Sequence, residues 1–204
     1  EEEYKIGCMC SLRDLEVNES LHKTFGGSIK ESLRHIVGVQ FRNMATVGGS
    51  IWGRFGFSDV LTVLLAMDTC VQLYKAGIVS LEEFVKMKYD RDILVNIIIK
   101  KSKLNIAYSS MRNQKTDFPV IACAVAQVND EYRVSVGARP SKAMLVRDEN
   151  KILAQGITNE SAKQFAQYVA EKTPTASNLR GSSAYRSHLI EVLTERALNE
   201  LRGF

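Results

Sequence analysis

A change of pattern near residue 104 constrains the fold more than any other feature of this sequence. Three strand-like runs then follow one another, "NIAYSSMR", "PVIACAVAQVN" and "EYRVSVGA". A short "ND" step, Asn129 and Asp130, joins the last two and predicts a tight hairpin. Helical patterns occupy residues 149–155, 160–172 and 182–201. Strands followed by helices predict a three-stranded antiparallel sheet with helices on one face.

The first half instead mixes short strands with helices. "YKIGCMC" alternates like a strand, and "SLRDLEVN" predicts a helix with Ser11 as its N-cap. "SDVLTVLLAMD" predicts a buried helix that begins near Ser58 or Asp59, and "TCVQLY" and "DILVNIIIKK" predict strands. We therefore expect an α+β chain of two units, residues 1–104 and residues 105–204.

Composition excludes several classes of protein. The 204 residues are 45% hydrophobic and 25% charged, as in a globular protein, and the net charge of +4 is scattered rather than clustered. Nucleic acid is therefore not an expected partner. The longest apolar stretch, Val60 to Met67, is too short to span a bilayer, and the N-terminus is acidic where a signal peptide is basic. We expect a cytoplasmic protein without a membrane partner.

Neither the cysteines nor the histidines form a recognisable catalytic or metal-binding pattern. Cys8 and Cys10 share one strand face, which allows a metal or redox pair, but two small core residues are the favoured interpretation. No histidine has a nucleophile or a carboxylate partner visible in the sequence, so neither a hydrolytic triad nor a metal site is predicted. The remaining residues of these two types are Cys70, Cys123, His22, His35 and His188.

A glycine pair in "FRNMATVGGSI" is the strongest candidate for a binding site. Gly48 and Gly49 could adopt positive φ and form a nest of amides for a pyrophosphate, with hydroxyl donors from Thr46 and Ser50. Asp59 would accept a hydrogen bond from a ribityl or ribose hydroxyl. On spacing alone, a plain turn with Asp59 as the helix N-cap is the preferred interpretation. The sequence contains neither the dinucleotide-binding glycine fingerprint nor a P-loop.

The glycine loop and the helix after it also resemble a known family. "FRNMATVGGSI" followed by "SDVLTVLLAMD" is similar to the FAD-binding subunit of molybdenum hydroxylases, the xanthine dehydrogenase and carbon monoxide dehydrogenase flavoprotein family. Four more segments resemble the family in the same order: "IGCMCSLRDLEVNESL", "YDRDILVNIII", "SMRNQKTDFPVIACAVA" and "ASNLRGSSAYRSHLIEVLTERAL". The resemblance therefore covers nearly the whole chain.

The resemblance implies both an architecture and a function. Residues 1–104 would be the second lobe of a two-lobed FAD-binding domain, and residues 105–204 the C-terminal flavoprotein domain. The subunit would pass electrons through FAD between iron-sulfur clusters on a partner subunit and a soluble acceptor such as NAD. The molybdenum cofactor and the organic substrate would also be bound by partner subunits. The alternative function is a flavin-free assembly scaffold with the same fold.

The resemblance also assigns roles to individual residues. It implies that Asp59 contacts the hydroxyls of FAD and that Ile36 and Leu94 flank its rings, although both apolar residues could equally be core residues. The residues implied to lie against the diphosphate are Thr46, Val47, Gly48, Gly49 and Ser50.

Three departures from the family pattern qualify these assignments. The first FAD lobe would precede residue 1, so we expect the chain by itself to bind FAD weakly. A basic residue and an arginine pair of the family are replaced by Ser109, Asn113 and Gln114, and two segments between residues 74 and 94 are shorter than usual. In the polar loop "SSMRNQKTD", Asp117 is expected to approach the side of the flavin that faces the electron acceptor. Arg112 and Lys115 of this loop are expected to be solvated.

Overall fold

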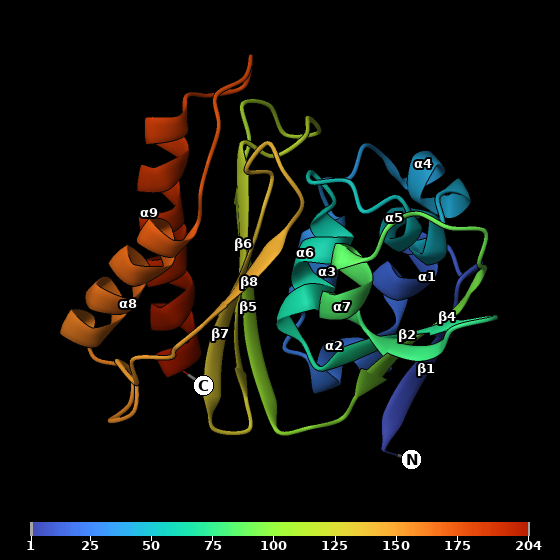
Figure 1. Ribbon diagram of the computed structural model, residues 1–204, viewed down its shortest axis with the longest axis horizontal. Helices are drawn as coiled ribbons and strands as arrows, with labels where there is room; N and C mark the ends of the chain where they lie inside the picture. The colour runs from blue at the N-terminus through green and yellow to red at the C-terminus, as the bar shows by residue number, and fades with distance from the viewer. Residues whose placement is uncertain (1, 204) are drawn as a thin grey trace.

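Figure 1 shows the computed structural model of the protein, which describes residues 2–203. The first half contains, in chain order, β1 (Glu3–Gly7), α1 (Leu12–Val17), α2 (Glu19–Thr24), α3 (Ser28–Leu33), α4 (Val39–Met44), α5 (Val47–Trp52), α6 (Asp59–Ala66), β2 (Thr69–Leu73), β3 (Gly77–Ser80), α7 (Leu81–Lys86) and β4 (Leu94–Lys100). The second half contains β5 (Leu104–Met111), β6 (Ile121–Val128), β7 (Glu131–Gly137), β8 (Met144–Arg147), α8 (Asn159–Lys172) and α9 (Ser183–Arg202).

Two antiparallel sheets organise the described residues. Their strand orders are β1-β4-β2-β3 in the first half and β5-β6-β7-β8 in the second. The second sheet stands between two layers of helices, with α8 and α9 on one side and α3 and α6 on the other (Figure 1). The expected α+β class is confirmed, but the helices cover both faces of the second sheet rather than one.

Local signals place several of these elements correctly. The hydroxyl of Ser11 accepts a hydrogen bond from the amide of Asp14, whose side chain returns a bond to the amide of Ser11, so α1 begins with a capping box. The hydroxyl of Ser58 caps α6 by accepting a hydrogen bond from the amide of Leu61, without a returned bond. Asn129, at the hairpin between β6 and β7, has φ of 55°. Asparagine tolerates this left-handed conformation better than most residues.

The expected three-stranded sheet is wrong by one strand. β8 pairs with β7 from Arg133–Arg147 to Val136–Met144 and forms the fourth strand. A run of four residues carries too little periodicity to predict this strand, and its position comes from pairing across the sheet. The helix expected over residues 149–155 is also absent from the described chain. Its backbone turns around Asp148, whose carboxylate accepts bonds from the amides of Ile152 and Leu153.

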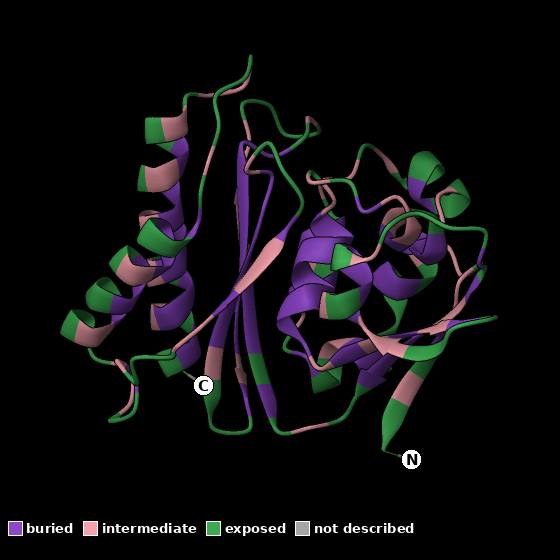
Figure 2. Ribbon diagram, in the orientation of Figure 1, coloured by how far each residue is buried: buried purple, intermediate pink, exposed green. Residues whose placement is uncertain are grey.

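Two hydrophobic clusters lie on opposite faces of the second sheet, and one of them contains residues of both halves. Alternate residues of the second sheet point to opposite faces, so Ile106 packs with the first half while Ala107 packs with α8 and α9. Buried residues run along α6, along the second sheet and along the sides of α8 and α9 that face the sheet (Figure 2). A hydrogen bond of 2.6 Å from Ser28 Oγ to the carbonyl of Ile106 also links α3 to β5. One face of the second sheet therefore packs against the first half, and the other face packs against α8 and α9.

Candidate functional site

A cavity of about 450 Å³ lies where the two halves of the chain meet. It is bounded by the turn after α3, the starts of α5 and α6, and the loop that follows β5. Its wall is mostly apolar and aromatic, with a few hydroxyl and charged groups. The lining residues are Leu12, His35, Ile36, Val37, Phe41, Ala45, Thr46, Gly49, Ser50, Phe55, Phe57, Ser58, Asp59, Val60, Arg112, Thr116, Asp117 and Phe118.

The glycine pair lies beside this cavity but does not form the expected nest. Both glycines stand in the first turn of α5, where neither has a positive φ. The amide of Gly48 donates to the carbonyl of Cys8 at 2.8 Å, and the amide of Gly49 donates to Oγ1 of Thr46 at 3.1 Å. The carbonyl of Cys8 and the N-cap Thr46 already accept hydrogen bonds from these amides, so the expectation of an array of free donors was wrong.

Five of the eight residues assigned by the resemblance line the cavity together: Ile36, Thr46, Gly49, Ser50 and Asp59. Val47 and Gly48 are buried behind them in α5. Leu94 does not line the cavity, because it lies in the first sheet opposite Leu73 and belongs to the hydrophobic core.

Asp59 is the most unusual polar residue of the wall because its carboxylate is buried. Asp59 is only 5% exposed. It is the first residue of α6, and the N-cap of this helix is Ser58 rather than Asp59. Oδ1 of Asp59 accepts hydrogen bonds from the hydroxyl of Tyr108 and from Nη2 of Arg112, the latter at 2.5 Å. Burial raises the pKa of Asp59, and the hydrogen bonds from Arg112 and Tyr108 oppose that rise.

Arg112 was expected to be solvated, but its side chain is only 7% exposed. Nη1 of Arg112 donates to the carbonyl of Asp117 at 2.6 Å, which fixes the loop after β5 over the cavity. Asp117 itself is held at 3.0 Å by Arg180. Tyr108 is buried by the alternation of β5, a signal present in the sequence, whereas the burial of Arg112 depends on a partner 53 residues away.

Three phenylalanines of the wall were not predicted. The rings of Phe55 and Phe57 stack with centroids 5.2 Å apart, and the rings of Phe57 and Phe118 lie 4.2 Å apart. Phe57 and Phe118 also line a second cavity of about 300 Å³, together with Arg180. No periodic pattern marks these residues, since the first two lie in the loop before α6. The aromatic cluster therefore separates two neighbouring cavities.

The comparison with protein families decides which family this chain belongs to. Residues 1–103 match the family described as the FAD binding domain in molybdopterin dehydrogenase. The chain belongs to this family. Residues 106–201 match the C-terminal domain of the CO dehydrogenase flavoprotein. The resemblance inferred from the motifs is thereby confirmed, and FAD is the cofactor of this part of the protein.

Individual relatives of this FAD-binding chain cover most of its length. YgfM of Escherichia coli K12 is 29% identical over 190 residues, which are 93% of this chain and 69% of YgfM. The glyceraldehyde dehydrogenase medium chain of Sulfolobus acidocaldarius is 24% identical over 213 residues, covering 96% of this chain and 75% of the relative.

Solved structures share the fold. Quinoline 2-oxidoreductase from Pseudomonas putida 86 superposes with a TM-score of 0.87 at 18% identity, and CO dehydrogenase from Hydrogenophaga pseudoflava with 0.86 at 21%. Each match covers 100% of this chain and 76% of the solved chain.

The cavity of this FAD-binding chain has the chemistry that the cofactor requires. Cofactor pockets typically measure about 300 to 1,000 Å³ and combine apolar walls with a few polar groups. Phe55, Phe57 and Phe118 offer ring faces to a planar ligand. Asp59 offers a carboxylate oxygen, Oδ2, that takes part in no hydrogen bond within residues 2–203. FAD would supply the redox chemistry when bound, and these residues would hold and orient it.

The part of the chain that the structure describes contains neither a membrane-spanning helix nor a metal-binding cluster. No helix within residues 2–203 is long and apolar enough to cross a membrane. The same residues contain no group of three or more histidine, cysteine or acidic side chains placed to hold a metal ion.

Proposed function

We propose that this chain carries FAD in an oxidoreductase of the xanthine dehydrogenase type. It passes electrons between iron-sulfur clusters of a partner subunit and a soluble acceptor such as NAD, while a further partner holds the molybdenum cofactor. The observation that carries this proposal is the cavity beside the glycine loop, whose one buried carboxylate, Asp59, keeps a free acceptor oxygen. Such a group suits a hydroxyl-rich cofactor.

The names of two relatives support a role in a larger assembly. The Sulfolobus acidocaldarius relative is a medium chain of glyceraldehyde dehydrogenase, and one from Paenarthrobacter nicotinovorans is a medium subunit of nicotine 6-hydroxylase, 23% identical over 182 residues. Both names denote one component of a multi-subunit oxidoreductase. The substrate of such an assembly is chosen outside this chain, so the proposal concerns electron transfer alone.

The proposal divides the chain at residue 104. Residues 1–104 act as the second lobe of the FAD-binding domain and residues 105–204 as the C-terminal flavoprotein domain. Thr46, Gly49 and Ser50 lie beside the diphosphate, with Val47 and Gly48 supporting them from behind. Asp59 accepts a hydrogen bond from a cofactor hydroxyl, and Ile36 flanks the rings. Leu94 supports the site only through the core.

Spectroscopy of the purified protein tests this function. We expect flavin absorption from the purified multi-subunit assembly, and saturable quenching of FAD fluorescence when FAD is titrated into its flavin-free form, the apoprotein. Asp59→Asn should weaken FAD binding about tenfold or more, because a hydrogen bond to a charged group is lost. Asp130→Asn, in the exposed hairpin between β6 and β7, is the matched control and should bind like the wild type.

The acceptor is tested separately. The flavin is reduced chemically, and reoxidation by NAD is compared with reoxidation by a quinone. Reoxidation by the quinone alone would overturn NAD as the acceptor. A protein that binds no FAD under any condition would instead support the flavin-free scaffold.

A further inference from the structure

Two buried arginines of the second sheet region hold the two ends of α6. At the N-terminal end, Nη2 of Arg112 lies 2.5 Å from Oδ1 of Asp59. At the C-terminal end, Nε of Arg133 donates to the carbonyl of Ala66 at 2.7 Å. The two contacts are alike in burial, since the side chains are 7% and 10% exposed, but only Arg112 lines the cavity.

The contact at the N-terminal end orients the carboxylate of Asp59. Both donors, Arg112 and Tyr108, approach the same oxygen, Oδ1. Because two donors at one oxygen restrict rotation of the carboxylate, the other oxygen keeps a defined direction. Within residues 2–203, Oδ2 is left without a hydrogen bond, on a residue that lines the cavity. A buried carboxylate without such partners would be strongly disfavoured.

Arg112 is itself held in place. Nη1 donates to the carbonyl of Asp117, so the planar guanidinium is fixed between α6 and the loop after β5. Tyr108 is buried beside it, and burial raises the pKa of Tyr108 well above its ordinary value. Tyr108 is therefore a neutral donor, and Arg112 supplies the only positive charge bonded to Asp59 within residues 2–203.

We propose that Arg112, together with Tyr108, is a positioning residue that keeps Asp59 ionised and directs its free oxygen at a hydroxyl of bound FAD. This inference rests on the proposed function and deepens it, because it makes the second half of the chain a determinant of cofactor affinity. Arg112 acts through Asp59 rather than by touching the cofactor. The hydrogen bond from Arg133 to Ala66, at the other end of α6, does not affect FAD affinity.

The dependence of FAD binding on pH distinguishes positioning from simple support. The titratable or charged groups that face Asp59 are His35 from the turn after α3, Tyr108 and Arg112 from β5 and its following loop, and Asp117 from the same loop. Burial raises the pKa of Asp59, and Arg112 opposes that rise. Removing Arg112 should therefore raise this pKa further, so that Asp59 is protonated, and FAD released, at a higher pH than in the wild type.

The experiment is a titration of FAD into the wild-type apoprotein and its variants between pH 5 and pH 9. Arg112→Met should weaken binding about tenfold or more at neutral pH and should move the acid loss of affinity to higher pH. Arg112→Lys should recover much of the affinity, because it keeps the charge. Tyr108→Phe should weaken binding less, since the ion pair remains. The matched control, Arg133→Met, removes a buried arginine from the other end of α6 and should lower stability but leave affinity and its pH profile unchanged.

Several outcomes would overturn the inference. Wild-type affinity and an unshifted pH profile in Arg112→Met would show that Arg112 does not position Asp59. An equal loss of affinity in Arg133→Met would show that any loosening of α6 has the same effect. If Arg112→Met does not fold, Tyr108→Phe decides, and wild-type FAD affinity in that variant would reject the idea. A wild-type protein that binds no FAD would reject the proposed function itself.

Discussion

The α-carbon of Gly48 lies so close to Cys8 that a Cβ at position 48 would be 2.7 Å from both the Cβ and the carbonyl oxygen of Cys8. Real Cβ atoms do not approach other atoms so closely. The amide of Gly48 donates to the same carbonyl of Cys8, so α5 is bonded tightly to the end of β1. Gly49 differs, because the nearest atom to a Cβ at position 49 would be the hydroxyl oxygen of Thr46 at 3.2 Å, and because Gly49 lines the cavity.

Alanine substitutions should separate the roles of the two glycines. Gly48→Ala forces the backbone of α5 away from Cys8 and should cost about 1 to 3 kcal/mol of unfolding free energy, as overpacking does. Gly49→Ala needs only a small shift of the Thr46 side chain, so its effect on stability should be smaller and its effect on FAD affinity larger. Urea unfolding and FAD titration of both variants check this. Equal stability losses would contradict it.

A buried ion pair should stabilise the turn that carries Ile36. Arg42 binds both carboxylate oxygens of Glu16, at 2.8 and 3.0 Å, and donates to the carbonyl of Ile36 at 2.9 Å. Glu16→Gln leaves a buried guanidinium without a countercharge and should lower the unfolding free energy by about 3 to 5 kcal/mol. Chemical denaturation measures it. Glu19→Gln, on the exposed start of α2, is the control and should change stability little.

The aromatic wall should contribute to cofactor binding more than to folding. Phe57 is 40% exposed and Phe118 is 47% exposed, so neither fills the core. Aromatic contacts of this kind are worth about 0.5 to 1.5 kcal/mol, so Phe57→Ala should weaken FAD binding up to about tenfold. Tyr74→Ala, an exposed tyrosine after β2 that does not line the cavity, is the control. Wild-type FAD affinity in Phe57→Ala would exclude a role for this ring.

The ion pair between α7 and β8 should make stability depend on pH. The hydrogen bond from Arg147 at 2.6 Å lowers the pKa of Glu82 to about 2, from an ordinary value of 4.5. Because the folded state binds this proton less readily than the unfolded state, the contribution is complete above pH 4.5 and is lost as pH falls toward 2. Glu82→Gln should therefore lower stability at pH 7.

Denaturant unfolding at several pH values checks the sign. The difference between the wild type and Glu82→Gln should shrink steadily from pH 5 to pH 3. Glu171→Gln, on the exposed end of α8, is the control and should show no such trend. A difference that grows as pH falls would contradict the assignment of Arg147 as the partner of Glu82.

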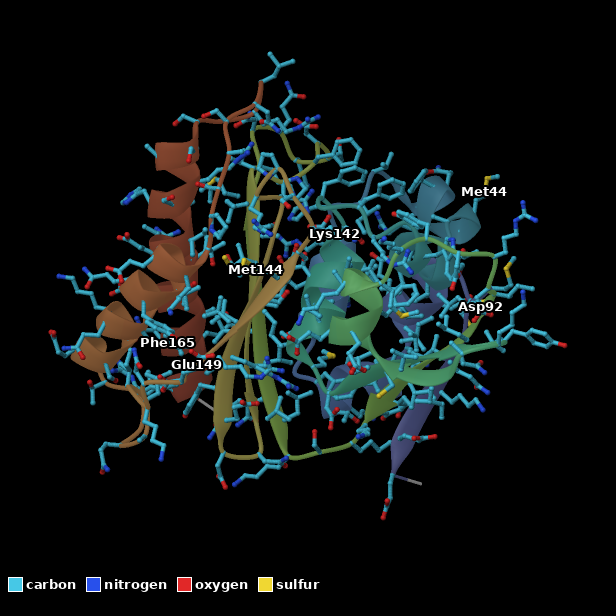
Figure 3. All side chains as sticks on the ribbon, in the orientation of Figure 1. Met44, Asp92, Lys142, Met144, Glu149 and Phe165 are labelled. Atoms are coloured by element: carbon cyan, nitrogen blue, oxygen red, sulfur yellow. The ribbon has the colours of Figure 1, made fainter. Side chains whose placement is uncertain are left out.

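The surroundings of Arg54, in the loop between α5 and α6, could not be predicted from a local sequence pattern. Arg54 is buried among the rings of Trp52, Phe84 and Tyr89, with its guanidinium carbon 3.9 Å from the centroid of Phe84. Its Nε donates to the carbonyl of Phe84, near the end of α7. Lys142, which is labelled in Figure 3, donates from the second half to the neighbouring carbonyl of Val85. Arg54 and Lys142 thus hold the end of α7 through contacts that the spacing of residues along the chain does not predict.

The sequence by itself determined those features whose partners lie within a few residues. The caps at Ser11 and Ser58, the β6–β7 hairpin at Asn129 and the long helices α8 and α9 follow from local hydrogen bonds and from periodicity. The family motif identified the glycine loop and Asp59 as candidates for the cofactor site.

Only the tertiary structure decided the features that depend on distant partners. The fourth strand, β8, forms because it pairs with the edge of β7. The amides of Gly48 and Gly49 donate to Cys8 and Thr46 rather than remaining free. Arg112 is buried because Asp59, 53 residues earlier in the chain, meets it at 2.5 Å. The buried pair of Arg112 and Asp59 forms only when the second sheet packs on α6 and excludes water. The spacing of residues along the chain does not predict this packing.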